Sequence, residues 1–160
     1  MRHVTGANAR IAAAVMIVAT LGIGAVAPVG ADQSSKTPVR VSDDFSSGSI
    51  RFVVEGIPAV FDPATYKVVF TNDSIGPHVL VVYKIPDGTS AEQLRTLLNS
   101  DDPPPEGAFF VNDVFAKPGQ THQGKYDVTV PGTYGYFCPI PTPAGVPHFN
   151  LGFVDVFEVT

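Results

Sequence analysis

Cysteine is almost absent from this sequence: Cys138 is the only one among 160 residues. A single cysteine excludes a disulfide bond within the chain. Its thiol could be an inert buried group, a reactive group, half of a bond to another chain, or a metal ligand. The residues that accompany Cys138 have to decide among these roles.

Basic residues are also scarce. The chain has 10 lysines and arginines against 15 aspartates and glutamates. Without the first 31 residues, which include Arg2 and Arg10, 8 basic and 15 acidic residues remain, a net charge of −7. Binding of nucleic acid requires a basic surface, so no nucleic-acid partner is expected.

The only long hydrophobic run, residues 11–29, follows Arg2 and Arg10 and is succeeded by small residues up to Ala31. This is the layout of a secretory signal peptide. We therefore predict that residues 1–31 are a cleaved signal peptide and that the protein is exported, either secreted or held in the cell envelope or periplasm. The alternative is a retained membrane anchor, because the run approaches the length that spans a bilayer.

The remaining chain is predicted to be a leader followed by one domain. Residues 32–49 are rich in Ser and Asp and indicate a flexible leader. Residues 50–160 alternate short runs of Val, Phe, Tyr and Thr with turns of Gly and Pro, of which the chain has 15 each. This pattern is typical of short β-strands. The predicted strands are residues 50–55, 66–71, 78–84, 109–115, 125–130, 133–138 and 149–159.

One short helix is predicted in an insertion at residues 90–106. Thr89 or Ser90 can cap it, and three consecutive prolines end it. Its apolar stripe has the i, i+3, i+4 spacing of an amphipathic helix and consists of Leu94, Leu97 and Leu98. Seven or so strands and one helix predict an all-β fold, a sandwich or barrel with a short helical insertion.

Three side chains with metal-binding chemistry lie where predicted strands meet loops. Cys138 ends one strand, a nine-residue loop leads to His148 before the last strand, and His78 begins a buried strand. Two histidines and a cysteine with a weak fourth position are the ligand pattern of a blue-copper site. Prolines stiffen the loop by fixing φ; they are residues 139, 141, 143 and 147.

Each of these residues has an ordinary explanation when taken alone. Cys138 could be a small buried apolar residue, His78 a hydrogen-bonded histidine at a strand start, and His148 an exposed loop residue. Only their combination indicates a metal site. His122 lies in a polar context and is expected to be solvated. Asn72 is a candidate to tie the loop before His78 to the loop after Cys138 by hydrogen bonds.

The chain resembles a known family in three stretches: residues 72–78, residues 132–138, and His148 with the strand 154–159. They resemble the cupredoxins, the small blue-copper proteins of the plastocyanin and azurin type, and the resemblance spans residues 50–160. It implies a cupredoxin-like Greek-key β-sandwich and one type 1 copper ion. The equatorial ligands that it implies are His78, Cys138 and His148.

The sequence departs from this family at the axial ligand. The family expects a methionine after the second histidine, but the best-matching position holds Phe153, with Leu151 as the nearby alternative, and neither can coordinate. Copper would then be three-coordinate, as in some multicopper oxidase sites with Leu or Phe here. Its potential should be raised, because Cu(II) loses more than Cu(I) when a donor is removed. The loop from Cys138 to His148 is also longer than in plastocyanin and closer to that of copper nitrite reductases.

The sequence thus predicts an exported, monomeric type 1 copper protein that transfers single electrons to a redox partner that the sequence does not identify. Electrons would pass by the exposed edge of His148, and the apolar surface around Pro147 and Phe149 would form the docking surface. The alternatives are a copper-binding or copper-delivery protein and a metal-free interaction module, since a site without an axial donor could bind metal weakly or not at all. No catalytic residues are predicted, because a Cys–His nucleophile needs a third, orienting group.

Overall fold

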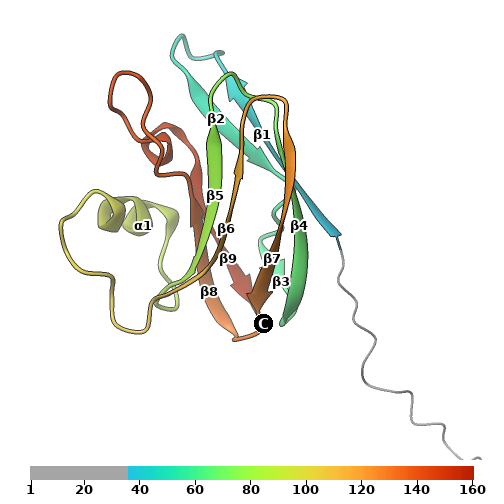
Figure 1. Ribbon diagram of the computed structural model, residues 1–160. Helices are drawn as coiled ribbons and strands as arrows, with labels where there is room; N and C mark the ends of the chain where they lie inside the picture. Colours follow the sequence, from blue (N-terminus) through green and yellow to red (C-terminus); the bar gives the residue numbers. More distant parts are fainter. Residues whose placement is uncertain (1–35) are drawn as a thin grey trace, which may run out of the picture. The chain divides into compact units, whose positions relative to one another are not determined.

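The computed structural model describes residues 36–160, which form a sandwich of two β-sheets with one short α-helix on the outside (Figure 1). The predicted signal peptide lies outside the described residues. Within residues 36–160, no helix has the length and apolar character needed to cross a membrane. The predicted fold class, mostly β with a short helical insertion, is confirmed.

The first sheet has four strands in the order β2-β1-β4-β7. Strand β1 runs parallel to β4 and antiparallel to β2, and β7 closes the other edge antiparallel to β4. The strands are β1 (Lys36–Asp44), β2 (Arg51–Glu55), β4 (Ala64–Asn72) and β7 (Thr121–Val128).

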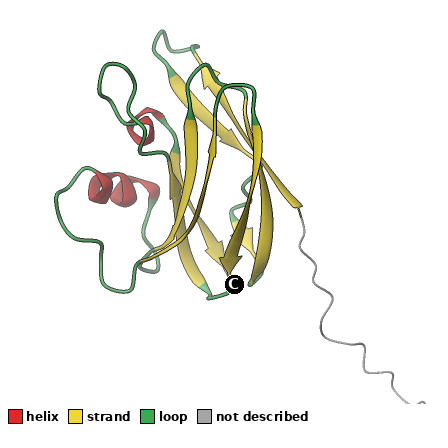
Figure 2. Ribbon diagram, viewed as in Figure 1, coloured by secondary structure: helices red, strands yellow, loops and turns green. Residues whose placement is uncertain are grey.

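The second sheet has five strands in the order β3-β9-β8-β5-β6. Its pairs are antiparallel, except that the two-residue β3 runs parallel to β9. The strands are β3 (Val60–Phe61), β5 (His78–Lys84), β6 (Phe109–Ala116), β8 (Gly132–Phe137) and β9 (Val154–Val159). Five of the seven β5 residues are buried, because this strand lies between β8 and β6 inside its sheet and α1 lies on the same sheet's outer face (Figure 2).

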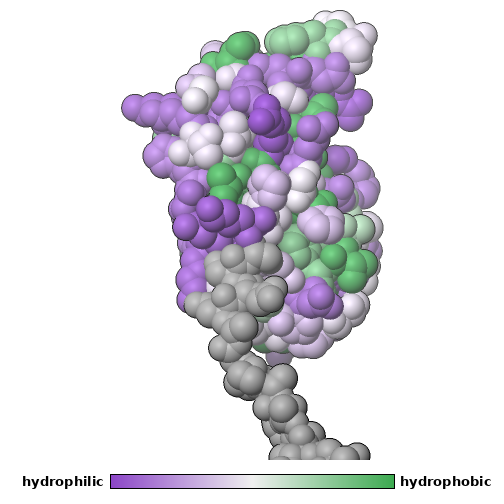
Figure 3. All heavy atoms as spheres, turned by 90° about the vertical axis from the view of Figure 1, so that its right-hand side faces the viewer, coloured by the Kyte–Doolittle hydropathy of each residue, from purple (hydrophilic) through white to green (hydrophobic). Residues whose placement is uncertain are grey.

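The main core fills the space between the sheets. Its fully buried members include Phe70 from β4, Leu80 from β5 and Tyr134 from β8. A smaller apolar cluster lies on the outer side of the five-stranded sheet and joins Leu94 of the helix to Phe137 and Val81. The side of the domain away from the helix is mostly hydrophilic, with smaller hydrophobic groups among the polar residues (Figure 3).

The predicted flexible leader is wrong for residues 36–44. They form β1, which pairs with two neighbours and inserts Val39 and Val41 into the core. Only these two positions of the strand are buried, so its alternation of apolar and polar residues is short. The Ser and Asp residues that follow dominate the composition of residues 32–49 and hide the strand. The pairing with β4 is a long-range contact that composition does not reveal. The domain therefore begins at least as early as Lys36, not at Ile50.

The predicted helix is confirmed as α1 (Ala91–Leu98). Ser90 caps it: its hydroxyl accepts from Gln93 N at 3.2 Å, and Gln93 Oε1 accepts from Ser90 N at 2.8 Å, which is a capping box. Leu94 packs onto the sheet above Gly135, where an added Cβ would lie 2.5 Å from the Leu94 side chain. A residue larger than glycine at position 135 would therefore push the helix away from the sheet.

The last strand was predicted to begin at Phe149, but β9 begins at Val154. Residues His148–Leu151 form a 3-10 turn, η1, which ends at Gly152 with φ 104°. Glycine adopts this left-handed conformation without the clash that a Cβ causes. The turn matters for the site, because it points His148 and Phe149 into the protein, where both are buried.

Replacing Gly132 with alanine should lower the free energy of unfolding by about 2–3 kcal/mol. Gly132 has φ 124°, and a Cβ there would clash with Asp87 Oδ1 and lie 2.6 Å from Lys84 Nζ. Those two atoms form an ion pair of 2.7 Å, and the Lys84 ammonium is buried. Chemical denaturation measures the loss. Gly107→Ala is the matched control, because Gly107 has φ 81° with open space around it; an equal loss in both variants would mean that backbone strain alone is responsible.

Candidate metal centre

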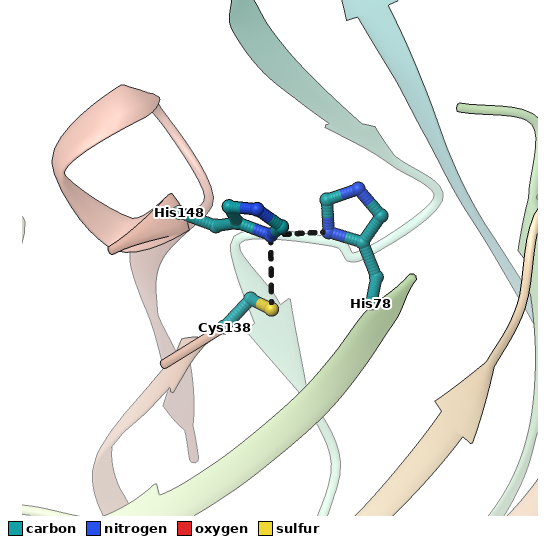
Figure 4. A group of neighbouring side chains, drawn as sticks. All are labelled: His78, Cys138 and His148. Atoms are coloured by element: carbon teal, nitrogen blue, oxygen red, sulfur yellow. Dashed lines mark hydrogen bonds between the residues drawn. The ribbon is translucent and has the colours of Figure 1, made fainter. Parts of the chain in front are cut away.

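His78, Cys138 and His148 come together at one end of the sandwich (Figure 4). One nitrogen from each histidine and the cysteine sulfur all lie within 4.8 Å of one another. The three side chains are buried, with 0%, 0% and 4% of their residue surfaces exposed. The predicted convergence of three residues separated by up to 70 positions is therefore present in the fold.

Backbone hydrogen bonds hold the two chain segments that carry Cys138 and His148 against each other. Cys138 N donates to Phe153 O at 3.1 Å, and Phe149 N donates to Cys138 O at 3.0 Å. His148 N donates to Ile140 O at 2.9 Å, which closes the base of the proline loop. His78 is supplied separately, as the first residue of the interior strand β5. Rigid backbone thus fixes all three donors.

The donor atoms are spaced as a single small ion requires. His148 Nδ1 lies 3.1 Å from His78 Nδ1 and 3.5 Å from Cys138 Sγ. First-row ions such as zinc bond imidazole at about 2.0–2.1 Å and thiolate at about 2.3 Å, so two donors to one ion are separated by at most about 4.4 Å. Both separations lie below this limit, and the three atoms all lie within 4.8 Å of one another, so their spacing is compatible with binding to one ion.

Comparisons with known proteins found similar folds only among solved structures. No protein-family model and no curated protein sequence matches the chain. An auracyanin of Roseiflexus castenholzii aligns at 21% identity over 78% of this chain and 97% of its own, with a TM-score of 0.47. Auracyanin A of Chloroflexus aurantiacus, a blue copper protein, aligns at 17% over 78% and 99%, with a TM-score of 0.48. A multicopper oxidase of Campylobacter jejuni aligns at 12% over 78% of this chain and 29% of its own, with a TM-score of 0.45.

The two-sheet sandwich, the short helical insertion and the burial of His78, Cys138 and His148 close together agree with the resemblance seen in the sequence. The chain has a cupredoxin fold. Because one fold serves proteins of different function, the chemistry of this cupredoxin domain has to be argued from its own side chains.

Burial keeps the thiol of Cys138 protonated in the absence of metal. It raises the pKa of Cys138, while hydrogen bonds from the backbone of Val79 and Ile140 lower that pKa and oppose the shift. Val79 N donates to Cys138 Sγ at 3.4 Å. A buried thiol with a raised pKa is a poor nucleophile, which agrees with the expectation that Cys138 does not act in covalent catalysis. A metal ion would have to displace its proton.

Both imidazoles are held in the neutral form that binds metal. Burial, and then the neighbouring His148, lower the pKa of His78 to about 3. Burial also lowers the pKa of His148, although the carboxylate of Asp43 opposes the shift. Neutral imidazole is the metal-binding form, so protons compete little for these two ligands near neutral pH.

Phe52 is a site residue that the sequence reasoning missed. Its ring lies 4.5 Å from the His78 ring and 4.4 Å from the His148 ring, centroid to centroid. It comes from β2, whose alternating pattern marks Phe52 as inward-facing but does not say what it faces. Packed against both imidazoles, it fixes their orientation and excludes water from them.

Phe153, predicted to fill the axial side, is fully buried next to His78, with ring centroids 5.2 Å apart. It offers no donor atom. The far nitrogen of the same histidine, His78 Nε2, is also buried and has no hydrogen-bond partner among the described residues. An acceptor at that nitrogen would make the imidazole a stronger base. Both features would weaken donation to an oxidised ion at this site.

Asn72 has a different role from the predicted one. Its amide donates to Gly76 O at 2.8 Å and to Ala116 O at 2.9 Å, and its oxygen accepts from Ser74. These bonds shape the turn that leads into His78 and tie it to the end of β6, not to the loop after Cys138. Asn72 therefore supports the site from the His78 side only.

The predicted route for electrons and the predicted docking surface are each wrong in one member. His148 is only 4% exposed, because η1 turns it into the protein, so it does not present the exposed edge that was expected. Phe149 is buried and packs against Phe137, because the η1 turn points it inward. The exposed apolar side chains near the site come instead from neighbouring loops and from β6: Ile75, Phe115 and Val146. His122 is exposed on β7, as predicted, and is not part of the site.

The metal-free protein should lose stability as the pH falls below about 6.5. The unfolded chain binds a proton on His78 near its ordinary pKa of about 6.5, whereas the folded protein does so only near pH 3. The stability that His78 contributes is fully present above its pKa in the unfolded chain. Below that pKa, His78 should lower the free energy of unfolding by about 1.4 kcal/mol per pH unit. The lowered pKa of His148 adds to the slope.

Urea unfolding between about pH 7 and 5 measures this slope, since most carboxylates stay ionised there. His78→Gln should flatten it, and His122→Gln, at an exposed position, should leave it unchanged. An unchanged slope in His78→Gln would contradict the assignment.

Proposed function

We propose that this protein binds one copper ion through His78 Nδ1, His148 Nδ1 and Cys138 Sγ and that it transfers single electrons. The observation that carries the proposal is the convergence of two neutral imidazoles and one thiol in a buried apolar pocket. Thiolate and imidazole together suit both oxidation states of copper. When bound, copper supplies a reversible one-electron couple.

The side chains of the site do the rest of the work. Phe52 packs on both imidazoles and restricts their movement. Backbone hydrogen bonds hold the segments that carry Cys138 and His148 in place. Donors that cannot move favour fast electron exchange, because little reorganisation accompanies the change of charge. The apolar Phe153 and the unpartnered His78 Nε2 favour the reduced ion, so we expect a high reduction potential.

Burial of the donors favours this function over copper delivery. A delivery protein must release its ion to a partner, which requires accessible ligands, whereas Cys138 is 0% and His148 4% exposed. A metal-free module would gain nothing from a buried imidazole nitrogen without a partner, which costs about 1–3 kcal/mol. We therefore place electron transfer first and delivery second.

Addition of Cu(II) to the purified protein tests the proposal. The expected result is an intense visible band from thiolate-to-Cu(II) charge transfer, which saturates at one ion per chain and disappears reversibly on reduction. Protein that stays colourless with Cu(II) and an oxidant would refute electron transfer. Protein that binds Cu(I) tightly but is never reversibly oxidised would instead support delivery or storage.

The cellular setting of this function is part of the proposal. We infer that the protein works as an exported monomer, secreted or in the cell envelope, with an unidentified redox protein as its partner. The sequence of residues 1–31 supports export. Mass spectrometry of the protein isolated from outside the cytoplasm distinguishes a chain that begins at Asp32 from one that keeps the segment as a membrane tether.

A further inference from the structure

A cavity of about 270 Å³ lies between α1, the loop that follows it and the outer face of the five-stranded sheet. Figure 1 shows this helix and loop standing beside β5 and β8. Three leucines of the helix form one wall and Pro103–Pro105 form another. The floor consists of Tyr83, Ile85 and Phe137. The metal donors are not among the lining residues, so this is a second, separate feature of the domain.

The floor of the cavity presents flat aromatic surface. The Tyr83 and Phe137 rings are stacked, with centroids 5.9 Å apart and planes inclined by 29°. Phe110 packs edge-on against Tyr83 from the other side, at 5.5 Å, and so holds the tyrosine ring in place. Aromatic rings prefer offset-stacked or edge-to-face neighbours, so a planar ring is the occupant that fits this floor.

The walls present few polar side chains: Ser100 and the exposed Asp102, whose carboxylate is their one charged group, and the Tyr83 hydroxyl on the floor. Ser100 Oγ already donates to Leu97 O at 3.0 Å and accepts from Asp102 N at 3.3 Å. The Tyr83 hydroxyl has no hydrogen-bond partner in the described part of the chain. Such a site accepts an apolar body and at most one or two polar substituents, in keeping with the few placed polar groups of small-molecule sites.

The volume and rigidity of the cavity limit the size of the molecule that can occupy it. An apolar cavity of about 150 Å³ holds one benzene ring, so 270 Å³ corresponds to about two fused rings. Three consecutive prolines fix φ along one wall, and the capping box fixes the start of the helix on the other. A preformed cavity requires little ordering on binding.

Two connections link the cavity to the metal centre. Phe137 on its floor is the residue before Cys138. Asn99, the C-cap of α1, exchanges two hydrogen bonds with Asn150 of η1, at 3.0 and 2.9 Å, and η1 begins with His148. An occupant that moves the helix or the floor therefore acts on segments that carry two of the three donors.

We propose that this cavity binds a small planar aromatic molecule of about two fused rings, and that its occupancy is felt at the metal centre. The first part needs no metal. The second part rests on the proposed copper function.

Calorimetric titration of the full chain with 2-naphthol, in metal-free protein, tests the first part. We expect one molecule per chain with a dissociation constant on the order of 100 µM, typical of a small ligand in an apolar site. Leu98→Trp should fill the cavity from the helix and weaken binding at least about tenfold. Ala108→Trp, which enters from the loop, is a second variant in case the helix does not tolerate the first.

Val130→Trp is the matched control, because Val130 is exposed and outside the cavity; it should bind 2-naphthol like the wild type. No saturable binding by the wild type, or equal binding by the cavity-filled variants and the control, would overturn the proposal. Copper-loaded protein provides the second readout, a shift of the visible band on addition of 2-naphthol that the filled variants lack. Binding without any visible band would refute the copper function and leave the cavity site standing, and a band that 2-naphthol binding does not move would overturn only the coupling.

Discussion

Cys138→Ser protein should show no visible charge-transfer band when Cu(II) is added, and its affinity for copper should fall by at least about a hundredfold. The band requires a thiolate bound to the ion. Serine has no sulfur, and its hydroxyl stays protonated near neutral pH, so it gives no such band. Cys138 is fully buried, and its sulfur accepts hydrogen bonds from the backbone of Val79 and Ile140. Serine fits the same space, so the metal-free fold should survive. Visible spectroscopy and a competitive copper titration measure the two losses.

His122→Ala is the control for this experiment, since His122 is an exposed histidine outside the cluster. It should keep the band at the wild-type intensity. The thermal unfolding of both metal-free variants should stay close to that of the wild type, which separates loss of a ligand from loss of the fold. Retention of the band in Cys138→Ser would show that the cysteine is not a ligand.

Phe153→Met protein should have a reduction potential lower than the wild type by about 60–100 mV. A thioether at this position is the weak axial donor that tunes blue-copper potentials, and it stabilises Cu(II) more than Cu(I). A tenfold change in the ratio of the two affinities corresponds to 59 mV for one electron. Phe153 lies 5.2 Å from the His78 ring, so a flexible side chain at this position can approach the other donors. A redox titration followed at the visible band measures the shift.

Phe153→Leu distinguishes donation from packing. Both substitutions shorten a fully buried side chain that also contacts Phe70, and both should cost about 1–3 kcal/mol of stability. Only methionine adds a donor atom. If both variants shift the potential equally, the cause is the altered packing around His78, and the axial role of position 153 is refuted.

The interior of the site explains why its ligands would bind across a wide pH range once the metal is present. Phe52 and Phe153 surround His78 with apolar surface, and this burial lowers the imidazole pKa to about 3. The same burial removes any acceptor from His78 Nε2. One structural feature thus keeps this imidazole unprotonated and would make it a weaker donor to Cu(II), so the proposed copper site would combine acid tolerance with a high potential.

The features that the sequence by itself determined are local or chemical. The capped helix at Ala91–Leu98 follows from Ser90 and the leucine spacing, and the buried strand His78–Lys84 follows from its continuous apolar residues. The three donors could be identified because few side chains bind metal and because His78, Cys138 and His148 occur beside turn-forming residues. The sequence identifies which side chains can bind metal, but it does not show which residues surround them.

Only the tertiary structure decided the distances and the surroundings. The 3.1 Å approach of the two histidines depends on how the two sheets pack, and a turn at Gly152, not a strand, points Phe149 inward. Phe52, which lies 26 residues before His78 in the chain, reaches both imidazoles. The cavity beside α1 is lined by residues of the helix, of the loop after it and of two strands. Periodicity specifies which face of a strand is buried. It cannot specify which remote side chain meets that face, because that contact is set by packing among segments far apart in the chain.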